Sequence, residues 1–95
     1  MKFSTLTFSE HALRRMFERE IARKDVRDVV ENGEAIAEYP DDRPFPSRLL
    51  FGSPRGRPLH VVLAIERDNE HGIVVTVYEP DPALWDVQFR RRRTR

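Results

Sequence analysis

Hydrophobic residues in the first third of the chain recur at helical spacing. Ser9 is a residue type that caps helices, and apolar residues follow it at intervals of three to four positions. They are Ala12, Leu13, Met16, Phe17 and Ile21. A shorter valine stripe at Val26, Val29 and Val30 precedes Asn32-Gly33, a typical helix stop. The pattern predicts two short helices, preceded by a short edge strand within residues 2–8.

After Gly33 the apolar period changes to two, which indicates strands. We predict strands over residues 34–39, 48–53, 57–66 and 73–79. Residues 40–47 contain three prolines and are predicted to be a loop, because proline cannot donate to a sheet ladder. Asp81-Pro82 predicts one last helical turn. The expected fold class is α+β, with two N-terminal helices packed on one face of a small antiparallel sheet.

Alternation along the predicted strands assigns their side chains to two faces. Apolar odd-numbered residues of strands 57–66 and 73–79 are expected to face the helices, which places His60 and Tyr78 together on the open face. If Pro54-Arg55-Gly56 is a three-residue connection, the even-numbered residues of strand 48–53 lie on the same open face, which adds Arg48 to it. A β-bulge in either hairpin would invert part of this assignment.

His60, Tyr78 and Arg48 have the chemical types needed to cleave RNA without a metal. Histidine titrates near neutrality and transfers protons, tyrosine donates a proton or orients the scissile group, and arginine clamps a phosphate. We therefore select these three residues as catalytic candidates. The alternative is that His60 and Tyr78 form an ordinary cross-strand pair and Arg48 is a solvated surface charge.

The first predicted helix carries a second polar line. His11, Arg15 and Arg19 fall within about 80° of arc beside the apolar stripe, because a helix turns about 100° per residue. This basic ridge is a candidate RNA-binding surface, unless these side chains only extend past the core at the helix edge. Trp85 is expected to hold the C-terminal turn on the sheet, the alternative being that it stacks on a base.

Composition limits the function classes. A chain of 95 residues forms one domain, and with 35% charged residues it has no apolar run of the ~20 residues that a membrane span requires. The N-terminus shows no secretory signal, so we expect a cytoplasmic protein that does not bind membranes. Cysteine is absent, and no histidine or carboxylate pair has the spacing of a zinc motif, so no cofactor or metal is expected.

Charge is distributed unevenly along the chain. Residues 90–95 carry five of the seventeen basic side chains, which leaves twelve basic and sixteen acidic residues before them. We expect residues 1–89 to form the domain and residues 90–95 to be a flexible basic tail. Arg90, Arg91, Arg92 and Arg93 join the predicted RNA contacts, although a merely solvated terminus has the same composition.

Several separated segments resemble a bacterial and archaeal family described as a domain of unknown function. They include the run His11-Ala12-Leu13-Arg14-Arg15-Met16, the run Arg57-Pro58-Leu59-His60-Val61-Val62 and the run Thr76-Val77-Tyr78-Glu79-Pro80-Asp81. That family resembles a branch of the RelE/ParE toxin superfamily, whose members are often accompanied by a small zinc-finger antitoxin of the MqsA type.

The resemblance implies a RelE-like fold and, by analogy, a ribonuclease of the messenger-RNA-cleaving type with RNA and an antitoxin protein as partners. A non-catalytic module that binds RNA or an antitoxin remains the alternative. Where the family commonly has glycine after Arg19, this chain has Glu20, which is costly if that residue must adopt positive φ. The target RNA, dependence on the ribosome and the oligomeric state stay open.

Overall fold

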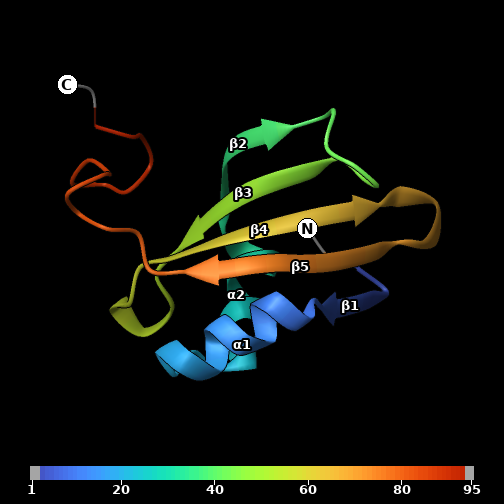
Figure 1. Cartoon of the computed structure of the whole chain (residues 1–95), viewed down its shortest axis with the longest axis horizontal. Coiled ribbons are helices and arrows are strands. Elements are labelled where there is room, and N and C mark those ends of the chain that lie inside the picture. The colour runs from blue at the N-terminus through green and yellow to red at the C-terminus, as the bar shows by residue number, and fades with distance from the viewer. Residues whose placement is uncertain (1–2, 94–95) are drawn as a thin grey trace.

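The computed structural model describes residues 3–93. The main elements are β1 (Thr5–Phe8), α1 (Glu10–Arg19), α2 (Arg23–Asn32), β2 (Glu34–Tyr39), β3 (Ser47–Gly52), β4 (Leu59–Glu66) and β5 (His71–Tyr78) (Figure 1). Two short 3-10 helices, η1 (Pro54–Gly56) and η2 (Arg67–Asn69), join β3 to β4 and β4 to β5. The α+β class is confirmed, and the two predicted helices and the predicted strands are present with their bounds moved by a few residues. The predicted last helical turn is a hydrogen-bonded turn at residues 82–84 and not a helix.

One sheet contains all five strands in the order β1-β5-β4-β3-β2. The three consecutive pairs from β2 to β5 are antiparallel, as short connections require. β1 is parallel to β5, however, so the sheet is mixed and the expectation of a purely antiparallel sheet was wrong. Parallel pairing is possible here because α1, α2 and three strands separate β1 from β5 along the chain.

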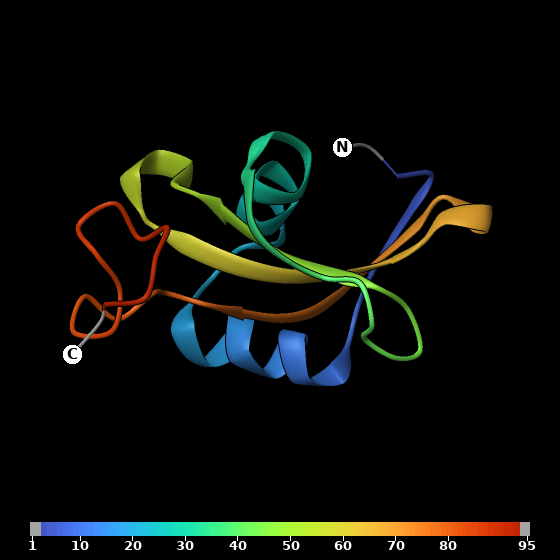
Figure 2. The ribbon, with the colours of Figure 1, turned by 90° about the horizontal axis from the view of Figure 1, so that it is seen from above.

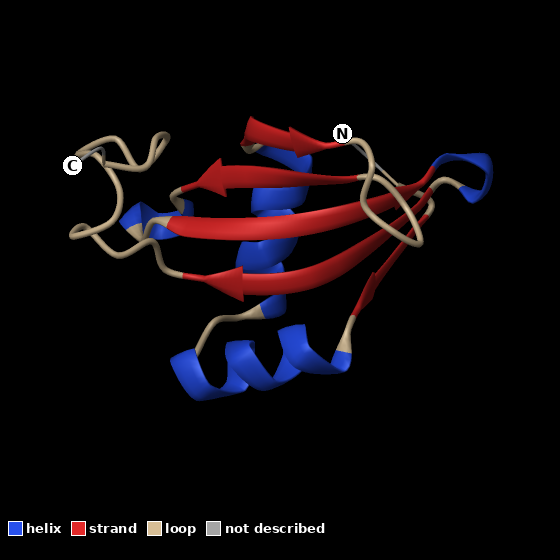
Figure 3. Cartoon of the chain, turned by 45° about the horizontal axis from the view of Figure 1, so that its top comes forward, coloured by secondary structure: helices blue, strands red, loops and turns tan. Residues whose placement is uncertain are grey.

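The two helices occupy different positions on the sheet. α2 crosses one face and packs on β3 and β4, whereas α1 lies along β5 at the edge of the sheet (Figures 2 and 3). The expected pair of helices side by side on one face was therefore wrong. The β1 strand is only four residues long and covers the first half of β5, which leaves the second half for α1. No helix within residues 3–93 has the length and apolar character needed to cross a membrane.

The apolar core lies between α2, α1 and the inner face of the sheet. The predicted inner set of β4, Leu59, Val61, Leu63 and Ile65, is buried, and the three valines of α2 are buried with it. Two residues of the α1 stripe are not core residues, since Leu13 and Phe17 are 37% and 86% exposed. Only one narrow side of α1 contacts the sheet, because the helix packs along an edge.

A β-bulge divides β5 into two registers. Val77 pairs with Val61, but beyond the bulge Val74, rather than Val75, pairs with Leu63 and is buried. The extra residue inverts the faces of the strand, so Val75 is 39% exposed. The second half of β5 keeps the predicted alternation, and His60 pairs directly with Tyr78 on the face opposite α2.

Replacing Glu20 with glycine is expected to raise the free energy of unfolding by about 1 kcal/mol, because a side chain in the left-handed region is strained. Glu20 ends α1 with φ +54° and ψ +50°, and its amide donates to the carbonyls of Met16 and Phe17. Urea denaturation of Glu20→Gly measures the change. Glu18→Gly, inside the same helix, is the control and should lower stability by about 1 kcal/mol. A loss of stability in both variants would contradict strain at Glu20.

Candidate functional site

A cleft of about 310 Å³ separates α1 from the second half of β5. Its residues are His11, Arg15 and Arg19 from α1 and Thr76, Val77 and Tyr78 from β5. The three α1 residues are four positions apart, so they follow one another along the same side of the helix. β1 ends opposite Val74, and this part of the β5 edge is therefore not covered by another strand. The predicted basic ridge and the predicted tyrosine meet in this cleft.

His11 and the two arginines are exposed in the cleft. His11 Nε2 lies 3.1 Å from the Thr76 hydroxyl, which ties the imidazole to the strand. Arg15 has only a long ion pair with Glu18, 3.7 Å between Nη1 and Oε1, with both side chains about half exposed. Such a pair contributes little and is readily exchanged for another anion. Two guanidinium groups and one imidazole thus face the cleft from one side.

Tyr78 faces the cleft from the other side and is hydrogen-bonded to His60. The Tyr78 hydroxyl lies 3.2 Å from His60 Nδ1, and His60 Nε2 lies 2.7 Å from the Phe89 carbonyl oxygen. A carbonyl oxygen only accepts, so Nε2 carries a hydrogen and donates it to Phe89. In the neutral imidazole Nδ1 is then the acceptor, and Tyr78 donates its hydroxyl hydrogen to His60. The free electron pairs of the phenol oxygen remain available to a ligand.

Burial favours the neutral forms of both members of this pair. His60 has no exposed surface, and desolvation lowers its pKa below the usual 6.5, while the hydrogen bond to Phe89 raises it by a smaller amount. Desolvation also raises the pKa of Tyr78, with a further increase from Tyr39 and an opposing effect of Arg92. At neutral pH the pair is a phenol that donates to an uncharged imidazole.

The C-terminal segment, residues 80–93, covers His60. Trp85 is buried, with its ring centroid 4.4 Å from that of His60 in an edge-on arrangement. The Phe51 ring contacts His60 from β3, with centroids 5.8 Å apart. The prediction that Trp85 holds this segment on the sheet is confirmed. The expectation that His60 lies on an open face was wrong, because the segment folds back over that end of the sheet.

The described part of the basic tail is held against the domain. Arg90 forms an ion pair with Glu34 of 2.9 Å and lies 5.3 Å from the Phe51 ring centroid. Arg92 lies over Trp85 at 5.7 Å, and Arg93 donates to the Pro82 carbonyl. Arg90, Arg92 and Arg93 therefore have local partners in this structure, and the flexibility of residues 90–95 stays a prediction. Arg91 is exposed, and residues 94–95 lie outside the described residues.

Arg48 does not join His60 and Tyr78. It pairs in register with Leu63, so it lies on the α2 face, while Leu49 and Phe51 occupy the opposite face. The parity argument failed because six residues, 53–58, rather than three separate the last paired residues of β3 and β4, Gly52 and Leu59. Arg48 forms an ion pair with Glu38 of 3.0 Å. The predicted three-residue grouping is thus reduced to His60 and Tyr78.

Arg57 positions the end of α1 at the cleft, a role that the sequence did not reveal. Its guanidinium donates to the Arg19 carbonyl at 2.6 Å and to the Glu20 carbonyl at 2.9 Å. It also forms an ion pair with Glu79 of 2.9 Å, and this hydrogen bond lowers the pKa of Glu79. One arginine therefore joins the C-terminus of α1 to the residue after β5. No local signal marks it, because its partners are distant in sequence.

Lowering the pH from 7.5 to 5 is expected to destabilise the protein in part through His60. The unfolded chain takes up this proton near pH 6.5, whereas the folded state takes it up only at lower pH. The unfolded state thus binds more protons below about pH 6.5, so the free energy of unfolding falls as pH falls. The His60 contribution is fully present above pH 6.5 and is lost as pH falls through the folded pKa.

Urea denaturation across this pH range, with His60→Gln beside the unchanged chain, isolates the effect. His60→Gln should show a shallower pH dependence, by at most one proton or about 1.4 kcal/mol per pH unit. His11→Gln is the matched control, since it removes an exposed imidazole of the same cleft region. Equal slopes for the unchanged chain and His60→Gln would show that His60 is not held neutral.

Within residues 3–93 no three histidine or carboxylate side chains gather closely enough to hold a metal ion. The cleft offers one exposed imidazole, two guanidinium groups and two hydroxyls instead. These groups can hold an anion such as a phosphate diester and can exchange protons with the hydroxyl groups beside it.

Comparison with known proteins identifies the family. Residues 8–79 match the model of the family described as a domain of unknown function, DUF4258. Neither the curated proteins nor the solved structures give a significant match. The matched residues contain both walls of the cleft, together with His60 and Arg57, while the covering C-terminal segment lies beyond them. This chain therefore belongs to the DUF4258 family.

Proposed function

We propose that the protein is a metal-independent endoribonuclease that cleaves RNA in the cleft between α1 and β5. The observation that carries the proposal is the convergence of His11, Arg15 and Arg19 with the hydroxyls of Thr76 and Tyr78 around one open cleft. Cations are needed to hold a phosphate diester, and two proton carriers are needed to transfer the phosphoryl group. The cleft has both.

The reaction begins at the ribose 2′-hydroxyl, whose oxygen attacks the adjacent phosphorus. The 2′-hydroxyl proton moves to the Tyr78 oxygen while the Tyr78 proton moves to His60 Nδ1, along the 3.2 Å hydrogen bond. The P–O5′ bond breaks, and protonated His11 gives its proton to the leaving 5′-oxygen. The products are a 2′,3′-cyclic phosphate and a 5′-hydroxyl. His60 ends as an imidazolium that still donates to the Phe89 carbonyl.

Arg15 and Arg19 bind the non-bridging phosphate oxygens in this proposal. Both side chains are exposed, and neither has a buried carboxylate partner among the described residues. Guanidinium groups bind phosphate oxygens in a two-pronged manner, which stabilises the extra negative charge of the transition state. Thr76 holds the His11 imidazole at the edge of the strand.

The resemblance to RelE/ParE toxins supports the same chemistry and adds a partner. Toxins of this kind are often accompanied by a small zinc-finger antitoxin, so expression of the chain alone should arrest growth and co-expression with an antitoxin of that type should restore it. His11→Gln should abolish the arrest while leaving the complex intact. Growth arrest that persists in His11→Gln would contradict RNA cleavage as its cause.

RNA cleavage is tested with the full chain and a single-stranded RNA oligonucleotide in excess EDTA. Products with 2′,3′-cyclic phosphate ends are expected, and Arg15→Gln/Arg19→Gln should reduce both binding and cleavage. Removing two phosphate contacts should also lower the slope of log affinity against log salt by about 1.4. Arg14→Gln/Arg27→Gln removes the same charge from exposed positions outside the cleft and is the control.

Two outcomes would contradict the proposal. RNA binding without cleavage, both on naked RNA and on translating ribosomes, would indicate a non-catalytic RNA-binding module. Equal salt slopes for the cleft variant and the control variant would show that RNA binds elsewhere, for example at the C-terminal arginines.

A further inference from the structure

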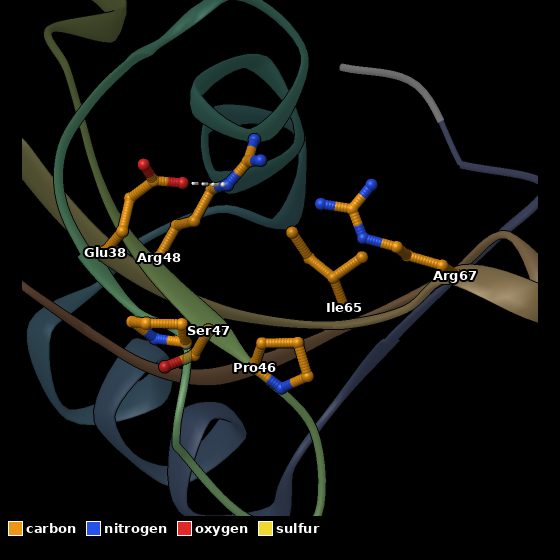
Figure 4. A pocket seen from close by; sticks show the side chains of 7 residues that line it. Glu38, Pro46, Ser47, Arg48, Ile65 and Arg67 are labelled. Atoms are coloured by element: carbon orange, nitrogen blue, oxygen red, sulfur yellow. Dashed lines mark ion pairs between the residues drawn. The ribbon is translucent and has the colours of Figure 1, made fainter.

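A second site lies on the opposite face of the sheet from Tyr78, where the ends of β2, β3 and β4 meet. A pocket of about 150 Å³ lies there. Figure 4 shows Arg48 and Arg67 on either side of Ile65 in its lining. Glu38, Ser47 and two prolines of the β2–β3 loop complete its walls. Arg48 was expected to act in catalysis, but its place on the α2 face leaves it without a role in the α1–β5 cleft.

Arg48 is oriented toward the pocket by Glu38. The ion pair joins Arg48 Nε to Glu38 Oε1 at 3.0 Å, and the two terminal nitrogens point away from Glu38 (Figure 4). The Arg48 side chain is only 25% exposed, which limits its hydration. A guanidinium held through Nε presents its outer edge to a ligand, and this edge matches a carboxylate in a two-pronged contact.

Arg67 supplies a second positive charge. It begins η2, directly after β4, and its guanidinium stands on the other side of Ile65 from Arg48 (Figure 4). Among residues 3–93, no carboxylate lies within ion-pair distance of Arg67. The pocket lining therefore carries two positive charges against one negative charge, from Glu38, and a single anionic group would balance it.

An apolar slot beside Val30 of α2 adjoins the pocket, since two residues line both spaces. A cavity of about 90 Å³ shares Arg48 and Ile65 with the pocket and is otherwise lined mainly by Val30, Leu50 and Leu63. A cavity of about 150 Å³ lined by aliphatic side chains is large enough to bind a molecule of the size of benzene. That is enough for a carboxylate and a short hydrocarbon chain, and too little for a nucleotide.

We propose that this pocket binds a small amphipathic carboxylate, with the carboxylate between Arg48 and Arg67 and a chain of a few carbons in the slot beside Leu63. The chemistry of the lining selects this class, because cations occupy the rim and aliphatic side chains occupy the interior. The site is independent of the proposed ribonuclease activity, since the sheet separates it from the α1–β5 cleft.

The test uses the ¹⁵N-labelled full chain titrated with hexanoate at neutral pH and followed by amide NMR shifts. Saturable shifts centred on Ile65, Leu63 and Val30 are expected. Butanoate, which is two methylenes shorter, should bind about tenfold more weakly. Hexanol, which lacks the charge, and inorganic phosphate, which lacks the chain, should each bind at least about tenfold more weakly than hexanoate.

Two arginine variants test whether the carboxylate binds where we propose. Arg67→Gln is an exposed substitution that should weaken hexanoate binding about threefold. Arg48→Lys keeps the charge but loses the two-pronged geometry, and it should weaken binding about tenfold. Arg14→Gln is the control and should bind as the unchanged chain does. Equal binding of hexanol and hexanoate, phosphate binding as tight as hexanoate, or no effect of either variant would overturn the proposal.

Discussion

His11→Gln in the full chain is expected to lower the rate of RNA cleavage by about 100- to 10,000-fold, the usual contribution of a general acid or base. In the proposed reaction His11 is the group that gives a proton to the leaving oxygen, and glutamine cannot do this. His11 is exposed, and its one described contact is the hydrogen bond to Thr76, so the variant should fold normally. Single-turnover cleavage of labelled RNA measures the rate.

The matched control is His71→Gln. His71 is also a histidine bonded to a threonine hydroxyl, 2.9 Å from Thr7, but it lies at the start of β5, away from the cleft. It should retain the rate of the unchanged chain. A large loss of cleavage in both variants would point to a structural cause, and unchanged cleavage in His11→Gln would exclude it as the proton donor.

The pH profile separates the proton donor from the acceptor pair. His11→Gln should remove the limb of the rate profile that falls as pH rises, because that limb reports loss of the donor's proton. His60→Gln should instead change the limb at low pH, where protonation of His60 blocks acceptance of the Tyr78 proton. Burial keeps the pKa of His60 below its usual value, so the low-pH limb should lie below pH 6.5. A profile that is unchanged in both variants would contradict the proposed steps.

The sequence predicts the fold well wherever the pattern is local. Ser9 caps α1 by accepting from the Ala12 amide, and the valines of α2 are buried in the core. The odd-numbered residues of β4 are also buried, as its alternation predicts. These features depend on residues within a few positions of one another, and such spacing is visible without knowledge of the rest of the chain.

The candidate site was predicted only in part. Its assembly depends on the strand registers and on the lengths of the connections, which the hydrophobic pattern does not show. His60 pairs with Tyr78 because the bulge in β5 shifts the register by one residue; without it His60 would lie opposite Val77. Arg48 is on the other face because the β3–β4 connection is longer than its turn residues suggested. One residue more or less in a connection exchanges the faces of a whole strand. The ridge on α1 reaches Tyr78 only because α1 packs at the edge of β5.

The contact of the C-terminal segment with His60 is the feature that the local sequence pattern predicts least well. The sequence indicated that Trp85 holds the C-terminal segment on the sheet. The carbonyl that fixes the His60 tautomer, however, belongs to Phe89, whose backbone has φ +59°. Backbone groups carry no residue-type signal, so no sequence pattern could have placed that acceptor. Arg90 had no visible partner in the sequence because Glu34 lies 56 positions earlier and Phe51 lies about 40 positions earlier.

Trp85→Ala is expected to lower the free energy of unfolding by about 3 kcal/mol, at the low end of the loss for a buried tryptophan. Trp85 is 8% exposed, and its ring contacts His60 and supports Arg92. Removing it leaves a gap over His60 and releases the segment that supplies the Phe89 carbonyl. Circular dichroism in urea measures the loss, since the variant has no tryptophan left for fluorescence.

Two control variants test whether the loss of stability is specific to the Trp85 ring or follows from shortening any side chain of this segment. Val87→Ala shortens an 83% exposed side chain of the same segment and should change stability by less than about 0.5 kcal/mol. Trp85→Phe retains a ring against His60 and should recover part of the loss. In Trp85→Ala, water reaches the imidazole, so the pKa of His60 should rise toward its ordinary value in an NMR titration. A full loss of stability with an unchanged His60 titration would show that Trp85 stabilises the segment without shielding His60, and the neutral imidazole would then depend on Phe51 and Tyr78 alone.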